Sequence, residues 1–130
     1  MNYYEQKKPT QRFNLMHELS VCQDLLTQVT TLATQHQASQ VALIVVQIGP
    51  LCGVVPELLE QAFTLAKIAT VAESAELILE TLPVRVRCQR CEAESEVLPN
   101  CLICKNCGDW QTQLISGDEM LLARVELVTA

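Results

Sequence analysis

The chain has 130 residues, 49% of them hydrophobic, a size and composition that suit one domain with a sizeable core and exclude general disorder. It carries 9 basic and 15 acidic residues, and three of the basic but only one of the acidic residues lie among the first fifteen. The remaining residues therefore have a net charge of −8, which disfavours nucleic acid as a partner. The longest uninterrupted apolar run, residues 41–46, is too short to cross a bilayer and no secretory leader follows the start, so we expect a cytoplasmic protein that binds no membrane.

The first half of the chain predicts an extension, a helix and a strand. Residues 1–15 have neither helical nor strand periodicity, so we expect a flexible N-terminal extension. Between residues 18 and 35 the apolar side chains recur at i, i+3, i+4 and i+7, which predicts an amphipathic helix with Cys22 on its buried face. Residues 41–48 are rich in β-branched side chains and predict a largely buried strand.

The second half begins at the turn Gly49-Pro50. A second helix is expected from Pro56, because proline suits a first helical turn. Residues 75–86 alternate as a strand that Pro83 confines to a sheet edge or a bulge. After a cysteine-rich segment, residues 119–128 alternate as a strand with one apolar face.

This order of elements predicts an α+β fold in which two helices cover one face of a three-stranded sheet. The last strand must return to that sheet after the cysteine-rich segment, so the segment is an insertion in a discontinuous domain. We expect the domain to comprise residues 16–84 and 114–130, and the inserted module to comprise residues 85–113.

The cysteines carry the strongest chemical signal. There are seven, an odd number, and five fall between residues 88 and 107, which favours a metal site over a disulfide framework. Cys88 and Cys91 form one CxxC pair, and twelve residues later Cys104 and Cys107 form a second, followed by a glycine. Two such pairs can build a tetrahedral S₄ cage, as in a zinc ribbon. Because a glycine after the second cysteine readily takes a positive φ, we prefer this second pair to Cys101 and Cys104, which leaves Cys101 as a spare thiol.

Four thiolates leave no open coordination position, so a structural Zn²⁺ is favoured over a catalytic one. The sequence contains no arrangement of nucleophile, base and orienting group and no phosphate-binding glycine loop, so we do not expect an enzyme. The same cysteine spacing also occurs in rubredoxin-type iron centres, so an electron carrier is the alternative. A zinc-ribbon nucleic-acid binder is a third hypothesis, which the acidic charge disfavours.

Several motifs together resemble the HypA/HybF nickel metallochaperones of [NiFe]-hydrogenase maturation. These motifs are MHELSVCQ at residues 16–23, Gln47-Ile48-Gly49, Val55-Pro56-Glu57-Leu58, the paired CxxC motifs, and SGDEM at residues 116–120. The resemblance covers about residues 16–128. It implies a nickel-binding α+β domain, a zinc module with a structural role, and Ni²⁺ as transferred cargo. It also implies a GTPase accessory protein and the hydrogenase large subunit as partners, and it allows a homodimer.

In that family nickel is held near the chain start by the terminal amine, backbone amide nitrogens and an imidazole. The resemblance carries these roles to Met16, His17 and Glu18. Amide nitrogens and an imidazole are donors that suit square-planar Ni²⁺. Here Met16 is internal and has no free amine. We therefore expect His17 to bind nickel, with the backbone or side chains of Met16 and Glu18 as co-ligands. Glu57 and Glu60 could add a carboxylate, although we favour their interpretation as a solvated acidic helix face.

Overall fold

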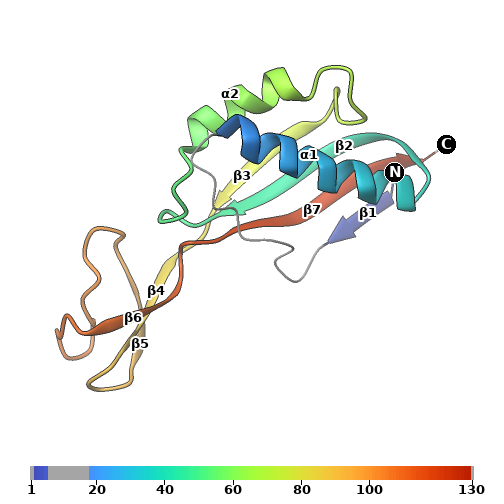
Figure 1. The fold of residues 1–130 in the computed structure, drawn as a ribbon. Helices are drawn as coiled ribbons and strands as arrows, with labels where there is room; N and C mark the ends of the chain where they lie inside the picture. The colour runs from blue at the N-terminus through green and yellow to red at the C-terminus, as the bar shows by residue number, and fades with distance from the viewer. Residues whose placement is uncertain (1, 6–17, 130) are drawn as a thin grey trace.

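The structure is a computed structural model that describes residues 2–5 and 18–129. It contains two β-sheets that follow one another along the long axis of the molecule, with both helices on the larger sheet (Figure 1). In chain order the elements are β1 (Asn2–Glu5), α1 (Glu18–Gln35), β2 (Ala38–Ile48), α2 (Pro56–Ala66), β3 (Glu76–Thr81), β4 (Val84–Cys88), β5 (Glu94–Val97), β6 (Thr112–Ser116) and β7 (Met120–Thr129).

The larger sheet has the strand order β1-β7-β2-β3. Strands β2 and β3 are parallel and are joined through α2, whereas β7 pairs antiparallel with β2. Because a parallel pair needs a crossover connection, the helix between β2 and β3 lies against the sheet that those strands form. The predicted three-stranded core of the sheet is confirmed as β7-β2-β3, and β1 adds a fourth strand at its edge.

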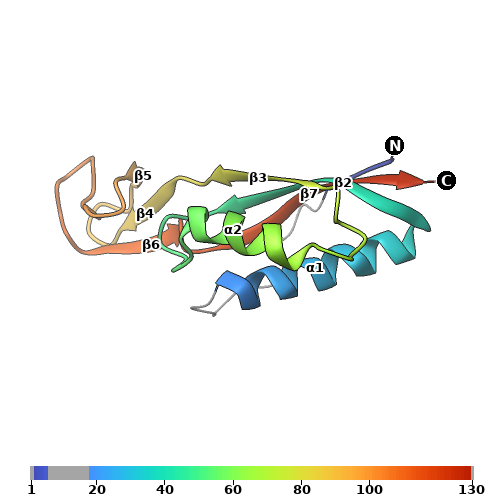
Figure 2. The same ribbon diagram turned by 90° about the horizontal axis from the view of Figure 1, so that it is seen from above.

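Helix α1 has the predicted bounds, and its apolar stripe is buried. Both helices cover the same face of the larger sheet, which Figure 2 shows from above. Cys22 is fully buried, as the periodicity predicts, and its Sγ donates to the carbonyl oxygen of Leu59 on α2 at 3.4 Å. Burial, and secondarily the charge of Glu18, raises the pKa of Cys22 to about 11, so this thiol stays neutral and belongs to the core.

The single strand predicted for residues 75–86 is wrong, because the chain forms two strands there that belong to different sheets. The N–H of Leu82 still donates to the carbonyl oxygen of Ile48, at 2.8 Å. Pro83 follows and has no N–H to continue the pairing, so the chain leaves the larger sheet and enters β4 of the smaller one. The periodicity alone could not place this break.

The N-terminal residues 2–5 also differ from the expected flexible extension, since they form β1 and pair with residues 124–127 of β7. The outer edge of β7 offers unpaired N–H and C=O groups, and backbone pairing satisfies them whatever side chains the added strand carries. The other residues of the expected extension lie outside the described residues.

The smaller sheet has the order β5-β4-β6 and contains the cysteine-rich segment. It spans residues 84–116, so it includes Val84 and residues 114–116, which the sequence analysis placed in the larger domain. In the described chain its buried core consists of Val84, Val86 and Val97, with Leu114 packed against them. So small a core cannot stabilise a module of this length by hydrophobic burial alone.

The two sheets meet where the loop after β2 crosses the chain between β6 and β7. A Cβ on Gly49 would lie 2.2 Å from the carbonyl oxygen of Gly117, so only glycine allows this approach. The crossing is also hydrogen-bonded, because the N–H of Leu51 donates to the same oxygen at 2.7 Å. Neither helix in the described ranges has the length and apolar character that crossing a bilayer would require.

Candidate metal centre

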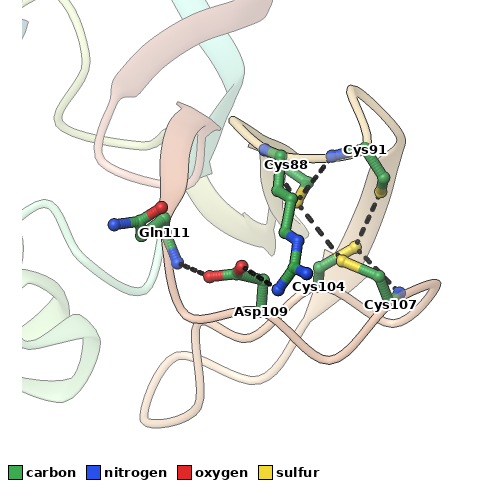
Figure 3. A network of polar contacts seen from close by, with 7 residues as sticks. Cys88, Cys91, Cys104, Cys107, Asp109 and Gln111 are labelled. Atoms are coloured by element: carbon green, nitrogen blue, oxygen red, sulfur yellow. Dashed lines mark hydrogen bonds and ion pairs between the residues drawn. The ribbon is translucent and has the colours of Figure 1, made fainter.

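The four cysteines of the two CxxC pairs converge at the tip of the smaller sheet. Their sulfur atoms all lie within 4.8 Å of one another, and we call these residues the cage cysteines: Cys88, Cys91, Cys104 and Cys107. Figure 3 shows the four side chains pointing toward a common centre. The Sγ atoms of Cys88 and Cys107 are 3.6 Å apart, as are those of Cys91 and Cys104. Tetrahedral Zn–S bonds of about 2.3 Å require sulfur separations of about 3.8 Å, so the arrangement fits a four-thiolate metal ion.

The two CxxC turns hold their first cysteine in the same way. The N–H groups of Arg90 and Cys91 donate to the Sγ of Cys88 at 3.3 and 3.4 Å. The N–H groups of Asn106 and Cys107 donate to the Sγ of Cys104 at the same two distances. Amide hydrogen bonds stabilise the negative charge of a thiolate, so both turns are suited to a metal-bound sulfur.

Each CxxC turn ends on a residue with a left-handed backbone. Gly108 has φ +79°, as its position after the second pair predicts, and its N–H donates to the carbonyl oxygen of Cys104 at 2.9 Å. Glu92 occupies the matching position after the first pair, with φ +63°. Its N–H donates to the carbonyl oxygen of Cys88 at 3.0 Å. A non-glycine residue is strained at such a φ. Sequence reasoning missed Glu92, although the equivalence of the two turns could have revealed it.

A polar contact braces the first turn against the second (Figure 3). The guanidinium of Arg90 lies 3.4 Å from a carboxylate oxygen of Asp109, and the other carboxylate oxygen accepts from the N–H of Gln111 at 2.8 Å. The hydrogen bond from Gln111, followed by the contact with Arg90, holds the pKa of Asp109 below its usual range. Arg90 and Lys105 also supply positive charge within the two turns, where a Zn²⁺ with four thiolates would carry a net −2.

The pKa values of Cys91 and Cys107 are shifted in opposite directions. Hydrogen bonds from the Asn106 side chain, first, and the Ala93 backbone lower the pKa of Cys91 to about 6. For Cys107 the Asp109 backbone lowers the pKa, but desolvation and the neighbouring cage thiols outweigh it and raise the pKa overall. A metal ion binds cysteine as the thiolate, so the proton of Cys107 must leave when a metal binds.

Cys101 stands apart from the cage. It is exposed, and its N–H donates to the carbonyl oxygen of Leu98 at 3.0 Å in an isolated bridge. The structure thus brings together Cys104 and Cys107, the pair that the sequence analysis preferred, and leaves Cys101 outside the cluster.

Of the three motif residues 16–18 to which the resemblance carries the nickel site, the structure describes only Glu18, because Met16 and His17 lie outside the described residues. Glu18 begins α1, and its half-buried side chain lines a groove with residues of α2. Glu57 and Glu60 are both exposed on α2. The structure therefore places the start of α1, which directly follows His17, beside α2.

A family model described as "Hydrogenase/urease nickel incorporation, metallochaperone, hypA" matches residues 16–127 of the chain. The match begins at Met16, so it leaves out the strand β1. It includes both helices, strands β2 to β6, most of β7 and all the cage cysteines.

Curated relatives and solved structures agree with this match. The hydrogenase maturation factor HypA of Aquifex aeolicus is 46% identical, covering 86% of this chain and 97% of the relative. That of Nitrosospira multiformis is 43% identical, covering 88% and 99%. The solution structure of the Ni metallochaperone HypA from Helicobacter pylori is 25% identical, with a TM-score of 0.64 over 88% of this chain and 99% of that one.

Proposed function

The chain belongs to the HypA family of nickel-incorporation metallochaperones, and on this premise we propose that it binds Ni²⁺ and delivers it for assembly of the [NiFe]-hydrogenase active site. The observation that carries the proposal is the family match itself, which runs without a break through the α+β domain and the metal module. A metallochaperone is a carrier and not an enzyme. Its chemistry is to hold a metal ion and release it to a partner.

We assign the module a structural Zn²⁺ bound by the cage cysteines. Four thiolates fill a tetrahedral shell and leave no position for water or substrate, which supports a structural role. The small valine core of the module supports it as well, because a bound metal would then supply most of the folding free energy. Iron in the same cage, as in rubredoxin, is the alternative that metal analysis separates from zinc.

We assign Ni²⁺ to His17, with Met16 and Glu18 as co-ligands. This assignment is supported by the family motif at residues 16–18, of which the last residue, Glu18, begins α1. An imidazole with adjacent amide nitrogens gives a square-planar donor set, and a carboxylate can complete it in place of the missing amine. Such a site releases nickel when the imidazole is protonated or when a partner offers better ligands.

The proposed partners are the GTPase accessory protein of hydrogenase maturation and the hydrogenase large subunit, with a homodimer as a further possible assembly. The net charge of −8 outside the first fifteen residues argues against nucleic acid. We place this function in the cytoplasm, where seven free cysteines would stay reduced.

Nickel titration and metal analysis of the purified chain and of His17→Ala test the proposal. We expect one zinc per chain in both proteins and specific nickel binding in the wild type only. His36→Ala is the matched control, since it removes the same kind of side chain at a position that directly follows the other end of α1. If the variant His17→Ala binds nickel as the wild type does, the assignment of His17 is wrong. A red protein that contains iron would instead support the electron carrier.

A further inference from the structure

A shallow apolar groove lies between the first turn of α1 and the outer side of α2. It has a volume of about 350 Å³ and is lined by Glu18, Leu19, Leu58, Gln61, Ala62 and Leu65. The α2 residues Leu58, Ala62 and Leu65 have the spacing i, i+4, i+7, so they form one stripe along the helix. The helix therefore presents two apolar stripes, because Leu59 and Phe63 face the core.

The leucine side chains of this groove are exposed to solvent. Leu19 is 49% exposed, Leu58 is 45% exposed and Leu65 is 69% exposed. Scattered apolar residues are normal on a protein surface, but here they converge on one concavity at a junction of two helices. A groove between two helices accepts a third amphipathic helix, whose apolar residues fill the spaces between the existing side chains.

The charges around the groove are acidic. Glu18 lines it, and Glu57 lies one helical turn before Gln61 on the same side of α2. Among the described residues, none that lines the groove is a lysine or arginine. A partner segment with lysine or arginine beside its apolar stripe would complement this field, whereas an anionic surface would be repelled.

We propose that this groove binds a basic amphipathic helix of the protein with which the chain exchanges nickel. The nickel part of the inference rests on the proposed function, because Glu18 directly follows the assigned ligand His17. A helix seated in the groove would contact Glu18, the residue that follows that ligand in the chain. A second copy of this chain fits less well, since a two-fold contact would bring the same acidic residues face to face.

The test uses the full zinc-loaded chain labelled with ¹⁵N and two synthetic helical peptides. Both peptides carry the same leucine stripe at i, i+4 and i+7; one has lysine at the flanking positions and the other has glutamate. We expect the lysine peptide to shift the amide signals of residues 18–19 and 58–65, and the glutamate peptide to bind at least tenfold more weakly. Raising the salt concentration should reduce this preference.

Two pairs of variants separate the groove from general effects. Leu58→Asp should weaken the lysine peptide at least tenfold, whereas Leu98→Asp, on an exposed leucine of the metal module, should leave its affinity unchanged. Glu57→Lys should weaken it about threefold at low salt. Glu60→Lys is the matched control, because it makes the same charge change on the same helix but on the side that faces away from the groove.

Three results would overturn the inference. The first is equal binding of the two peptides, and the second is a set of signal changes that map to the metal module. The third is a change in the signals of residues 18–19 and 58–65 when the protein concentration is raised without peptide. That third result would assign the groove to a second copy of the chain. The peptide titration needs no nickel, and we expect His17→Ala to bind the peptide like the wild type. A failed nickel titration with intact peptide binding would therefore refute the proposed function and leave the groove assigned.

Discussion

Substitutions at the two left-handed positions of the metal module should have opposite effects on its stability: a non-glycine residue in place of Gly108 should lower it, and a glycine in place of Glu92 should raise it. Gly108 and Glu92 both have a positive φ after the second cysteine of their pairs. A Cβ on Gly108 would have no atom within 4 Å, so any cost of Gly108→Ala comes from backbone conformation and not from a clash. The variant Glu92→Gly removes the corresponding strain from the first turn.

The magnitude follows from two opposing contributions. A non-glycine residue in the left-handed region costs about 1–2 kcal/mol, and glycine loses about 0.4–1 kcal/mol more than alanine in unfolded-chain entropy. The balance is about 1 kcal/mol, unfavourable for Gly108→Ala and favourable for Glu92→Gly. Because metal binding and folding of the module are coupled, this free energy appears as about a fivefold change in zinc affinity.

The assay is competition for zinc against a chelator of known affinity at fixed pH and salt. We expect Gly108→Ala to bind zinc about fivefold more weakly than the wild type and Glu92→Gly to bind it more tightly. The control Glu92→Ala removes the carboxylate but keeps the Cβ, so it separates charge from conformation. Unchanged affinity for Gly108→Ala would refute the reasoning, as would an equal gain for Glu92→Ala and Glu92→Gly.

Three further predictions address the cage, the chain start and the junction of the sheets. Replacing any one of the cage cysteines by serine should release the zinc, whereas Cys101→Ser should keep one zinc per chain; metal analysis after gel filtration checks both, and zinc loss from Cys101→Ser would contradict the cage. A protein that begins at Met16 should bind Ni²⁺ at least tenfold more tightly than the 130-residue chain, about 1.4 kcal/mol, because it regains the amine donor; equal titrations with the same spectrum would exclude the amine as a ligand. Gly49→Ala should lower the free energy of unfolding in urea by about 1–3 kcal/mol, because its Cβ would overlap the Gly117 carbonyl; a change below 0.5 kcal/mol would show that this contact yields easily.

Features that depend on residues close together in the chain could be predicted from the sequence. Helix α1 could be bounded correctly because its apolar stripe repeats over 18 residues, and the two CxxC turns could be recognised because the spacing of Cys88 and Cys91 fixes their local geometry. The positive φ of Gly108 was predictable for the same reason, since glycine is the residue that adopts it at least cost.

Features that depend on groups far apart in the chain could not be predicted in this way. Strand β1 forms because the β7 edge offers free backbone groups, which no pattern in residues 2–5 reveals. The division between β3 and β4 depends on where the chain stops pairing with Ile48 of β2. The second apolar stripe of α2 forms a groove only because Leu19 of α1 lies beside it. Periodicity records which side of an element is apolar, but only the packed fold determines which of those sides is covered and which is left open to a partner.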